Sequence, residues 1–202
     1  MTRKLTGQKI LIATHNKGKL EEFAELFAPY GVQTTSCKEL GLGEPAETET
    51  TFRGNALIKA SAACKASGII TISDDSGLCV DALHGAPGVY TADWAGPQRN
   101  WEMAMRLVEA KLQVAQALKP ELRKAQFCCT LCVMWPDGEV RYFEGRAHGQ
   151  MVWPTRGALG HGYDPAFQPD GSNLTFAEMS HEAKNKISHR ALALEKLFAE
   201  LF

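Results

Sequence analysis

Apolar positions in the first third of the chain change spacing from segment to segment. A short apolar run at Lys9–Ala13 predicts a strand, and a second strand is predicted at Val32–Ser36. Between them, helical spacing predicts a helix over Lys17–Phe27, because its apolar residues fall on one face: Leu20, Phe23, Leu26 and Phe27. A strand followed by a turn and a helix is therefore expected near the N-terminus.

An acidic stretch without periodicity, Gly41–Thr51, predicts a loop. The alanine-rich segment Phe52–Ser67 then predicts a helix, and the apolar run Ile69–Ile72 a short strand. That strand is expected to end at the polar segment Ser73–Gly77. Two adjacent carboxylates are thus expected at the exit of a strand.

The second half of the chain adds a predicted helix and a hairpin. Gly85–Gly88 is typical of a turn, and Asn100–Leu118 of a helix. Strands are expected at Ala125–Trp135 and Glu139–Arg146, joined by a turn, and the tail Glu182–Phe202 is expected to be helical. Helices interleaved with an antiparallel hairpin predict an α/β fold with a mixed sheet.

Composition restricts the class of protein. With 202 residues, 45% of them hydrophobic, we expect a single domain spanning 1–202, built as one body or two tightly joined lobes. A formal charge of −1 supplies no basic field for nucleic acid. The longest apolar runs fall short of the roughly 20 residues of a membrane helix, and the first ten residues lack a signal-peptide core. The sequence predicts a cytoplasmic protein with no nucleic-acid or membrane partner.

Six scattered cysteines fit a reducing compartment better than a disulfide framework. Cys129 and Cys132 form a C-x-x-C pattern, which occurs in redox pairs and zinc sites. No second pair follows, and the surrounding apolar residues favour a buried strand in which cysteine packs as a small hydrophobe.

Candidate phosphate ligands gather at the first helix. The segment Thr14, His15, Asn16, Lys17, Gly18 and Lys19 places hydroxyl, amide and ammonium donors where free backbone N–H groups already favour an anion. An ordinary N-cap followed by solvated lysines is the alternative.

Candidate metal ligands are acidic. Asp74 and Asp75 repel each other unless a cation neutralises them, and hard oxygen ligands suit Mg²⁺. Glu47 in the acidic loop is a third candidate. The alternative is a turn aspartate beside a solvated one, with an acidic loop that is only soluble surface.

Two later segments are candidates for binding a flat base. His161, Gly162, Tyr163 and Asp164 form a glycine-flanked loop with two rings, although a turn with a buried tyrosine is the alternative. Lys184, His189 and Arg190 follow on a helical stretch, for which a solvated charged face is the default.

Together, six ordered blocks resemble the inosine triphosphate pyrophosphatase family from about Ile10 to Ala193. The blocks are ATHNKGKLEEF from Ala13, ETETTFRGNALIKA from Glu47, SDDSGLCVDAL from Ser73, GAPGVYTA from Gly85, GHGYDPAF from Gly160 and AEMSHEAKNKISHRALAL from Ala177. The resemblance implies two lobes around a long central sheet, a nucleotide cleft between them, a homodimer, and Mg²⁺-dependent hydrolysis of non-standard purine nucleoside triphosphates, such as those of inosine and xanthosine, to monophosphate and pyrophosphate.

The resemblance also implies residue roles. Glu47 and Asp75 would bind Mg²⁺, with Asp74 in support, and Asp75 would be the general base. The phosphates would be held by Thr14, Asn16, Lys19 and Lys59, the substrate also by Ser76, and the base by His161–Asp164, Lys184, His189 and Arg190.

Three positions depart from the family pattern. Glu49 stands where glycine is frequent, Gly54 where glutamate is frequent, and His161 where phenylalanine commonly stacks on the base. A histidine still stacks, but its charge changes near neutral pH. Two other functions fit the same blocks: a nucleotide-binding module without catalysis, and a pyrophosphatase for pyrimidine or modified nucleotides.

Overall fold

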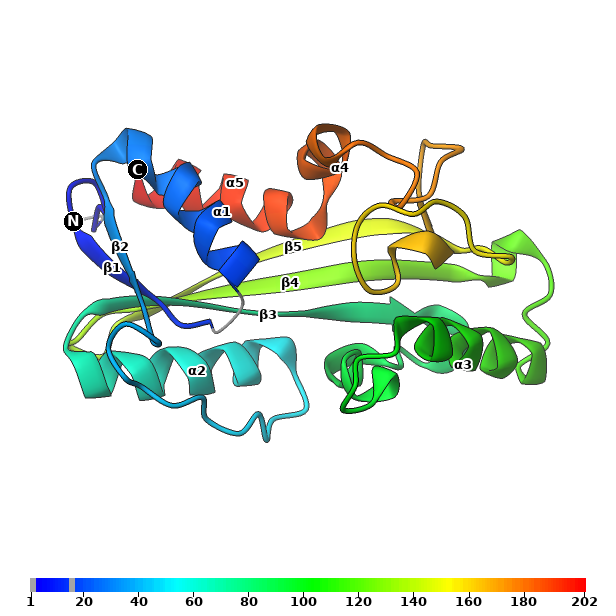
Figure 1. The fold of residues 1–202 in the computed structure, drawn as a ribbon, viewed down its shortest axis with the longest axis horizontal. Coiled ribbons are helices and arrows are strands. Elements are labelled where there is room, and N and C mark those ends of the chain that lie inside the picture. The colour runs from blue at the N-terminus through cyan, green and yellow to red at the C-terminus, as the bar shows by residue number, and fades with distance from the viewer. Residues whose placement is uncertain (1–2, 15–16) are drawn as a thin grey trace. The chain divides into compact units, whose positions relative to one another are not determined.

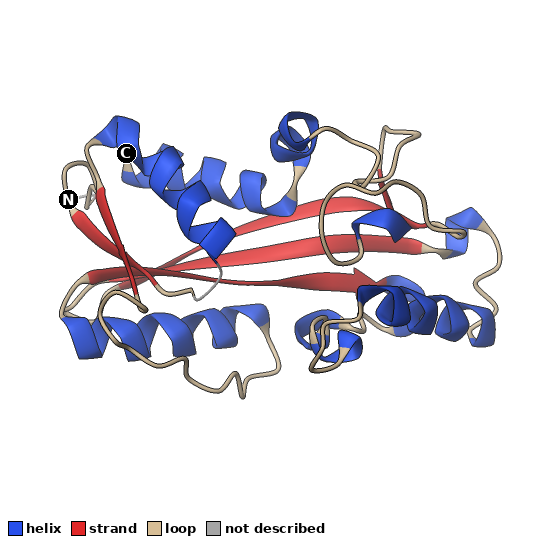
Figure 2. Cartoon of the chain, viewed as in Figure 1, coloured by secondary structure: helices blue, strands red, loops and turns tan. Residues whose placement is uncertain are grey.

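A computed structural model describes residues 3–14 and 17–202 (Figure 1). Its described residues contain one mixed sheet in the order β2-β1-β3-β4-β5-β6. The strands are β1 (Lys9–Ile12), β2 (Gln33–Ser36), β3 (Ile70–Val80), β4 (Lys124–Met134), β5 (Val140–Met151) and β6 (Phe167–Pro169). The helices are α1 (Lys17–Phe27), α2 (Phe52–Ser67), α3 (Trp101–Val114), α4 (His181–Ile187) and α5 (His189–Leu201) (Figure 2).

Strand pairing confirms the predicted mixed α/β sheet. β1 is parallel to both of its neighbours, with Ile10 opposite Thr34 of β2 and Ile70 of β3. β5 and β6 are antiparallel. β4 and β5 form the predicted hairpin, whose turn closes where the Trp135 N–H donates to the Glu139 carbonyl at 2.9 Å.

The chain divides into two compact units. The first contains the residues up to Asp75, together with Thr130–Glu144 and Ala193–Phe202. In it, α1 and α5 lie on one side of the sheet and α2 on the other (Figure 1). Small side chains of α2 allow it to approach β4 closely, and the cluster they form consists of Ala56, Ala60, Cys64, Cys132 and Met134.

The second unit comprises Ser76–Cys129 and Gly145–Leu192. Its core packs the apolar face of α3 against alternate residues of the strands, because strand side chains point to opposite faces in turn. The α3 residues are Ala104, Met105, Val108 and Leu112, and they meet Leu78, Val80, Phe127 and Ala147. This core supports the loop that carries the candidate base-binding residues.

Two helix predictions are confirmed at both ends, and one strand prediction is wrong. α1 and α2 begin and end where the spacing predicted. The strand expected to stop at Ile72 continues to Val80, so Asp74 and Asp75 lie within β3 instead of at its exit. These residues are only 3% and 8% exposed. Partners from other segments, described below, let the strand carry polar residues that in sequence resemble a turn.

The C-terminal tail is helical, as expected, but it forms two helices. Ser188 leaves the helical region, with φ −70° and ψ 153°, and separates α4 from α5. Its N–H donates to the Lys184 carbonyl at 2.9 Å, while its hydroxyl accepts a hydrogen bond from the Ala191 N–H at 3.2 Å. One serine therefore ends α4 and caps the start of α5. Lys184 and His189 consequently lie on different helices.

Cys129 and Cys132 confirm the interpretation of a buried strand. They are 1% and 0% exposed, and they lie three residues apart on β4, so that their side chains point to opposite faces. All six cysteines are described, and none is in a disulfide. Among the described helices, none has both the length and the apolar character needed to cross a bilayer.

Candidate active site

Lys59 joins two of the predicted carboxylates in the first unit. Helix α2 directs this lysine toward the loop and toward β3, with a side chain only 11% exposed. Its Nζ lies 2.5 Å from Glu47 Oε1 and 3.7 Å from Asp75 Oδ1. Acidic side chains from a loop and from a strand, far apart in sequence, therefore share one cation.

Burial controls the ionisation of Asp75. It raises the pKa of this carboxyl from 3.8 to about 6, against the opposing charge of Lys59, and the nearby Glu47 adds to the rise. For Lys59, burial alone would lower the pKa, but the carboxylates of Asp74, Asp75 and Glu47 outweigh it and raise the pKa. The lysine stays charged, and Asp75 is a carboxylate whose proton affinity is close to that required of a base at neutral pH.

Asp74 points away from this pair. Adjacent strand residues project to opposite faces, and Asp74 Oδ2 meets the Lys19 Nζ of α1 at 2.6 Å. Its side chain is 3% exposed, so the ion pair neutralises a buried charge. Asp74 thus contacts Lys19, a residue predicted to bind phosphate, on the face of β3 opposite to that of Asp75.

Asn55 is a site residue that the sequence reasoning missed. It is 2% exposed, and its Oδ1 accepts a hydrogen bond from the Glu49 N–H at 2.9 Å. A hydrogen bond from its side chain also lowers the pKa of Asp75. One amide thus fastens the acidic loop to the strand that carries Asp75. A polar residue within an alanine-rich helix was the only sequence signal.

Two of the departures from the family pattern contact each other. A Cβ added at Gly54 would lie 2.6 Å from the Cβ of Glu49, which no pair of side chains tolerates without movement. A side chain at position 54 would therefore force Glu49 or the first turn of α2 to shift. The two departures lie against each other where the loop meets α2.

The donor set around Lys59 suits a hard divalent cation. Glu47 and Asp75 offer carboxylate oxygens to a common positive charge, and Mg²⁺ typically takes one or two carboxylates while keeping waters and phosphate oxygens. Within residues 3–14 and 17–202, no three His, Cys, Asp or Glu side chains group closely enough to hold a metal by themselves.

The predicted phosphate segment is described in part. Thr14, 9% exposed, follows β1, and its N–H donates to the Ile12 carbonyl at 2.9 Å. His15 and Asn16 lie outside the described residues. Lys17 and Gly18 begin α1, which confirms the predicted helix start after this segment. Ser76, partly exposed, follows Asp75 on β3 and is the first residue of the second unit.

Asp164 organises the candidate base-binding loop of the second unit. Its carboxylate, 2% exposed, accepts a hydrogen bond from the His161 N–H at 2.6 Å and meets the Lys184 Nζ at 2.5 Å. Gly160 has φ +78°, and a Cβ there would collide with this carboxylate. Glycine at position 160 therefore lets the loop close over Asp164, which fastens it to α4.

The two rings of this loop have different environments. Tyr163 is 1% exposed, and its hydroxyl donates to the Thr91 carbonyl at 3.2 Å, so the alternative of a buried tyrosine describes it. His161 is exposed, and its ring meets the edge of Trp101 with centroids 5.0 Å apart. Of the two rings, His161 is the one with a surface to offer a ligand.

His189 and Arg190, the remaining residues predicted to bind the purine base, are the first two residues of α5. His189 stacks on Phe127 with ring centroids 5.0 Å apart and an interplanar angle of 16°. Arg190 follows it, and both residues are partly buried. Trp101 and Phe127, which orient the two histidines, were not identified from the sequence, because aromatic residues in apolar segments are typical of any core.

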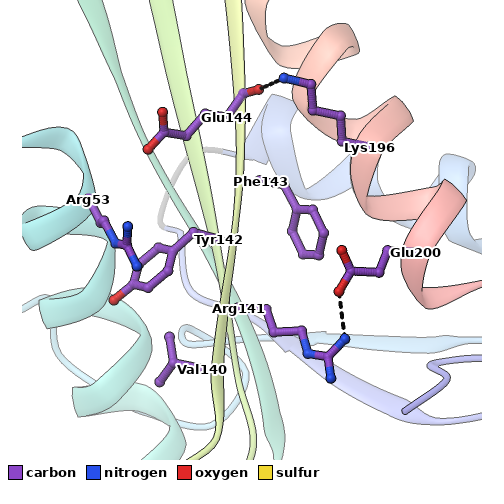
Figure 3. A pocket seen from close by; sticks show the side chains of 8 residues that line it. All are labelled: Arg53, Val140, Arg141, Tyr142, Phe143, Glu144, Lys196 and Glu200. Carbon is purple, nitrogen blue, oxygen red and sulfur yellow. Dashed lines mark hydrogen bonds and ion pairs between the residues drawn. The ribbon is translucent and has the colours of Figure 1, made fainter. Parts of the chain in front are cut away.

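A separate hollow of about 680 Å³ lies in the first unit (Figure 3). Its charges are largely matched: Arg141 meets Glu200 at 2.5 Å, and Lys196 donates to the Glu144 carbonyl at 2.7 Å. Arg53 stacks on the ring of Tyr142 at 3.9 Å. None of the predicted site residues that the structure describes lines it.

Comparison with known proteins decides the family. A model of the Ham1 family matches residues 10–200. The chain belongs to the Ham1 family. The resemblance carried by the six sequence blocks is thereby confirmed, since Ham1 relatives bear the name dITP/XTP pyrophosphatase.

Ham1 proteins match this chain over nearly their whole length. A dITP/XTP pyrophosphatase of Ruegeria pomeroyi is 56% identical and covers 100% of this chain and 99% of its own. One from Mesorhizobium japonicum is 52% identical, over 95% of this chain and 92% of its own. The solved structure of a HAM1 protein from Coxiella burnetii superposes with a TM-score of 0.90 at 34% identity, covering 95% of this chain and 97% of the other. The Ham1 fold is thus shared along the chain.

Proposed function

We propose that this Ham1 protein hydrolyses non-standard purine nucleoside triphosphates (ITP, dITP and XTP) to the monophosphate and pyrophosphate, and so removes them from the nucleotide pool. The observation that carries the proposal is the meeting of Glu47 and Asp75 at the ammonium of Lys59. Two carboxylates and a lysine at one point are suited to a triphosphate and its divalent cation.

In this proposal the phosphates lie against Thr14, Asn16, Lys19 and Lys59. Lys59 has the clearest support, because its charge is maintained by three carboxylates and can be offered to the incoming phosphates. Lys19 is drawn to Asp74 and is held beside the same strand. The backbone N–H groups at the start of α1 add donors for an anion.

Glu47 and Asp75 would hold the metal, with Asp74 in support. Mg²⁺, when bound, supplies charge neutralisation and lowers the pKa of a coordinated water. Asp75 would take the proton of the attacking water on a carboxylate oxygen. In the metal-free protein, a pKa of about 6 leaves this group mostly ionised at pH 7, as a general base requires. The nucleophile would attack the α-phosphorus, with pyrophosphate leaving.

Base recognition is assigned to the second unit. His161, with Gly162 to Asp164 shaping its loop, would contact the flat face, and Lys184, His189 and Arg190 would read the edge. A 6-oxo purine accepts hydrogen bonds from such donors, whereas adenine presents an amino group and leaves them unsatisfied. Discrimination of several kcal/mol, on the order of 100-fold or more in rate, is expected from unpaired buried polar groups.

We also propose that the protein is a homodimer and that it acts in the cytoplasm.

The experiment measures pyrophosphate release with Mg²⁺ for ITP, dITP, XTP, ATP, GTP and a pyrimidine triphosphate, and compares kcat/KM. The three non-standard purines should lead, and Asp75→Asn should remain folded but lose nearly all turnover. Equal rates for the whole panel would refute base selection. Tight ITP binding without any turnover would favour a binding module.

A further inference from the structure

Two cysteines from different strands meet in the second unit. Cys79 lies on β3 and Cys128 on the neighbouring β4. Their sulfurs are 3.9 Å apart, and the Cys128 thiol donates to the Cys79 sulfur. The two cysteines are 49 positions apart in the sequence, so no short sequence motif predicts that they meet. Proximity of this kind removes most of the entropic cost of bringing two thiols together.

Exposure distinguishes Cys79 from the other five cysteines. Cys79 is partly exposed, whereas the others are at most 7% exposed: Cys37, Cys64, Cys128, Cys129 and Cys132. A small dissolved oxidant therefore has access to Cys79 first. Cys128, buried beside it, is placed to react with whatever forms on that sulfur.

The surroundings of Cys79 also favour its thiolate. The hydrogen bond from Cys128 and the positive charge of Arg146 lower the pKa of the Cys79 thiol, in spite of burial and of the negative charge of Asp81. By contrast, burial raises the pKa of Cys37 and of Cys64, and raises that of Cys132 to about 12. Since the thiolate is the nucleophile, reactivity and access coincide at one residue.

We propose that Cys79 and Cys128 form a modification site at which hydrogen peroxide produces an intramolecular disulfide. In the first step the Cys79 sulfur attacks a peroxide oxygen, the O–O bond breaks and hydroxide leaves, which gives a sulfenic acid. In the second step the Cys128 sulfur attacks the Cys79 sulfur, the S–O bond breaks, and the oxygen leaves as water with the thiol proton. Two thiols lose two electrons and two protons, and peroxide becomes two waters.

The geometry requires a modest adjustment. The sulfurs must approach from 3.9 Å to the roughly 2.0 Å of a disulfide bond, between residues on neighbouring strands. In a reducing compartment, small thiols return the disulfide to two thiols by exchange, so the modification is reversible. The site is separate from the residues assigned to catalysis.

The test uses the full chain, reduced and then exposed to hydrogen peroxide. Remaining thiols are alkylated in denaturant, and the protein is digested and mapped by mass spectrometry. The expected result is loss of two of the six thiols and a linked peptide pair containing Cys79 and Cys128, both reversed by a dithiol reductant. A linkage between other cysteines, unchanged thiols, or Cys79 oxidised to sulfinic acid without a linkage would overturn the proposal.

Matched variants separate the two roles. Cys79→Ser should abolish the linkage, and Cys128→Ser should stop the reaction at a sulfenic acid on Cys79, which a 1,3-diketone probe traps. Cys129→Ser is the control: it neighbours Cys128 on β4, points to the opposite face and should leave the linkage intact. Melting curves check that each variant folds, and the wild-type peptide map decides the question if one does not. Linkage surviving in Cys79→Ser would refute the pairing.

Discussion

Replacing Asp75 by asparagine tests the energetic cost of holding a candidate general base in a buried position. The folded protein raises the pKa of this carboxyl from 3.8 to about 6, mainly by burial, so the folded state binds its proton more tightly than the unfolded chain does. Stability linked to Asp75 is therefore fully present below pH 3.8 and is lost as the pH rises to about 6. Ionised Asp75 destabilises the metal-free fold.

The magnitude follows from the same pKa change. A rise from 3.8 to about 6 corresponds to about 3 kcal/mol of unfolding free energy at pH 8. At pH 4 the loss is below about 1 kcal/mol. Asparagine resembles the protonated acid in shape and charge, so Asp75→Asn should be more stable than the wild type by these amounts while losing turnover.

The assay is urea unfolding of both proteins with a chelator present, at pH 4 and pH 8. Only the difference between the proteins is interpreted, since other carboxylates titrate in both. Asp74→Asn is the control: it removes the carboxylate partner of the Lys19 ammonium, so no comparable gain is expected. An Asp75→Asn variant no more stable than the wild type at pH 8, or equally stabilised at both pH values, would contradict the reasoning.

Three further predictions address the neighbouring contacts. Gly54→Ala should destabilise the wild-type protein by about 1–3 kcal/mol, because the added methyl group overpacks against Glu49. In a Glu49→Gly background, the same substitution should be neutral or should stabilise the protein by up to about 1 kcal/mol. Additive effects of the two substitutions on urea unfolding of the four proteins would exclude the contact. Asn55→Ala should cost about 1–3 kcal/mol for each buried group it leaves unsatisfied and lower kcat for ITP, because the acidic loop loses its attachment; unchanged stability and kcat would count against that role. Lys184→Met removes the cation that faces buried Asp164 and should raise the KM for ITP about tenfold, or 1.4 kcal/mol, with a smaller change in kcat; an effect confined to kcat would place Lys184 elsewhere in the reaction.

Sequence patterns predicted the helices and strands that are determined by their own residues and by the residues next to them. The helix over α2 follows from alanine-rich composition, and Thr51 caps it by accepting a hydrogen bond from the Gly54 N–H. The continuation of β3 through Asp74 and Asp75 was not predictable in this way, because the partners that make buried carboxylates acceptable come from α1 and α2. Ser188 likewise separates two helices through contacts that a helical spacing pattern does not record.

In the candidate site, too, some residues could be predicted from the sequence, whereas others depend on contacts between distant segments. Glu47 and Asp75 were candidates from their acidic side chains, the resemblance gave them roles, and the structure adds that both contact Lys59. The hydrogen bond of Asn55 and the contact between Glu49 and Gly54 depend on how the loop lies against α2, which residue types alone do not specify. Mg²⁺ binding and the roles of the individual site residues stay predictions.

The placement of Asp75 inside β3 has a consequence for motion. Amide groups that are paired within a sheet exchange with deuterium only when the sheet opens, whereas a loop such as the one carrying Glu47 opens at little cost. Deuterium uptake should therefore be slow around Asp75 and fast around Glu47. The Asp75 carboxylate is thus held in place by the sheet, whereas the Glu47 carboxylate can move with its loop. A rearrangement that admits a ligand is therefore expected in the loop.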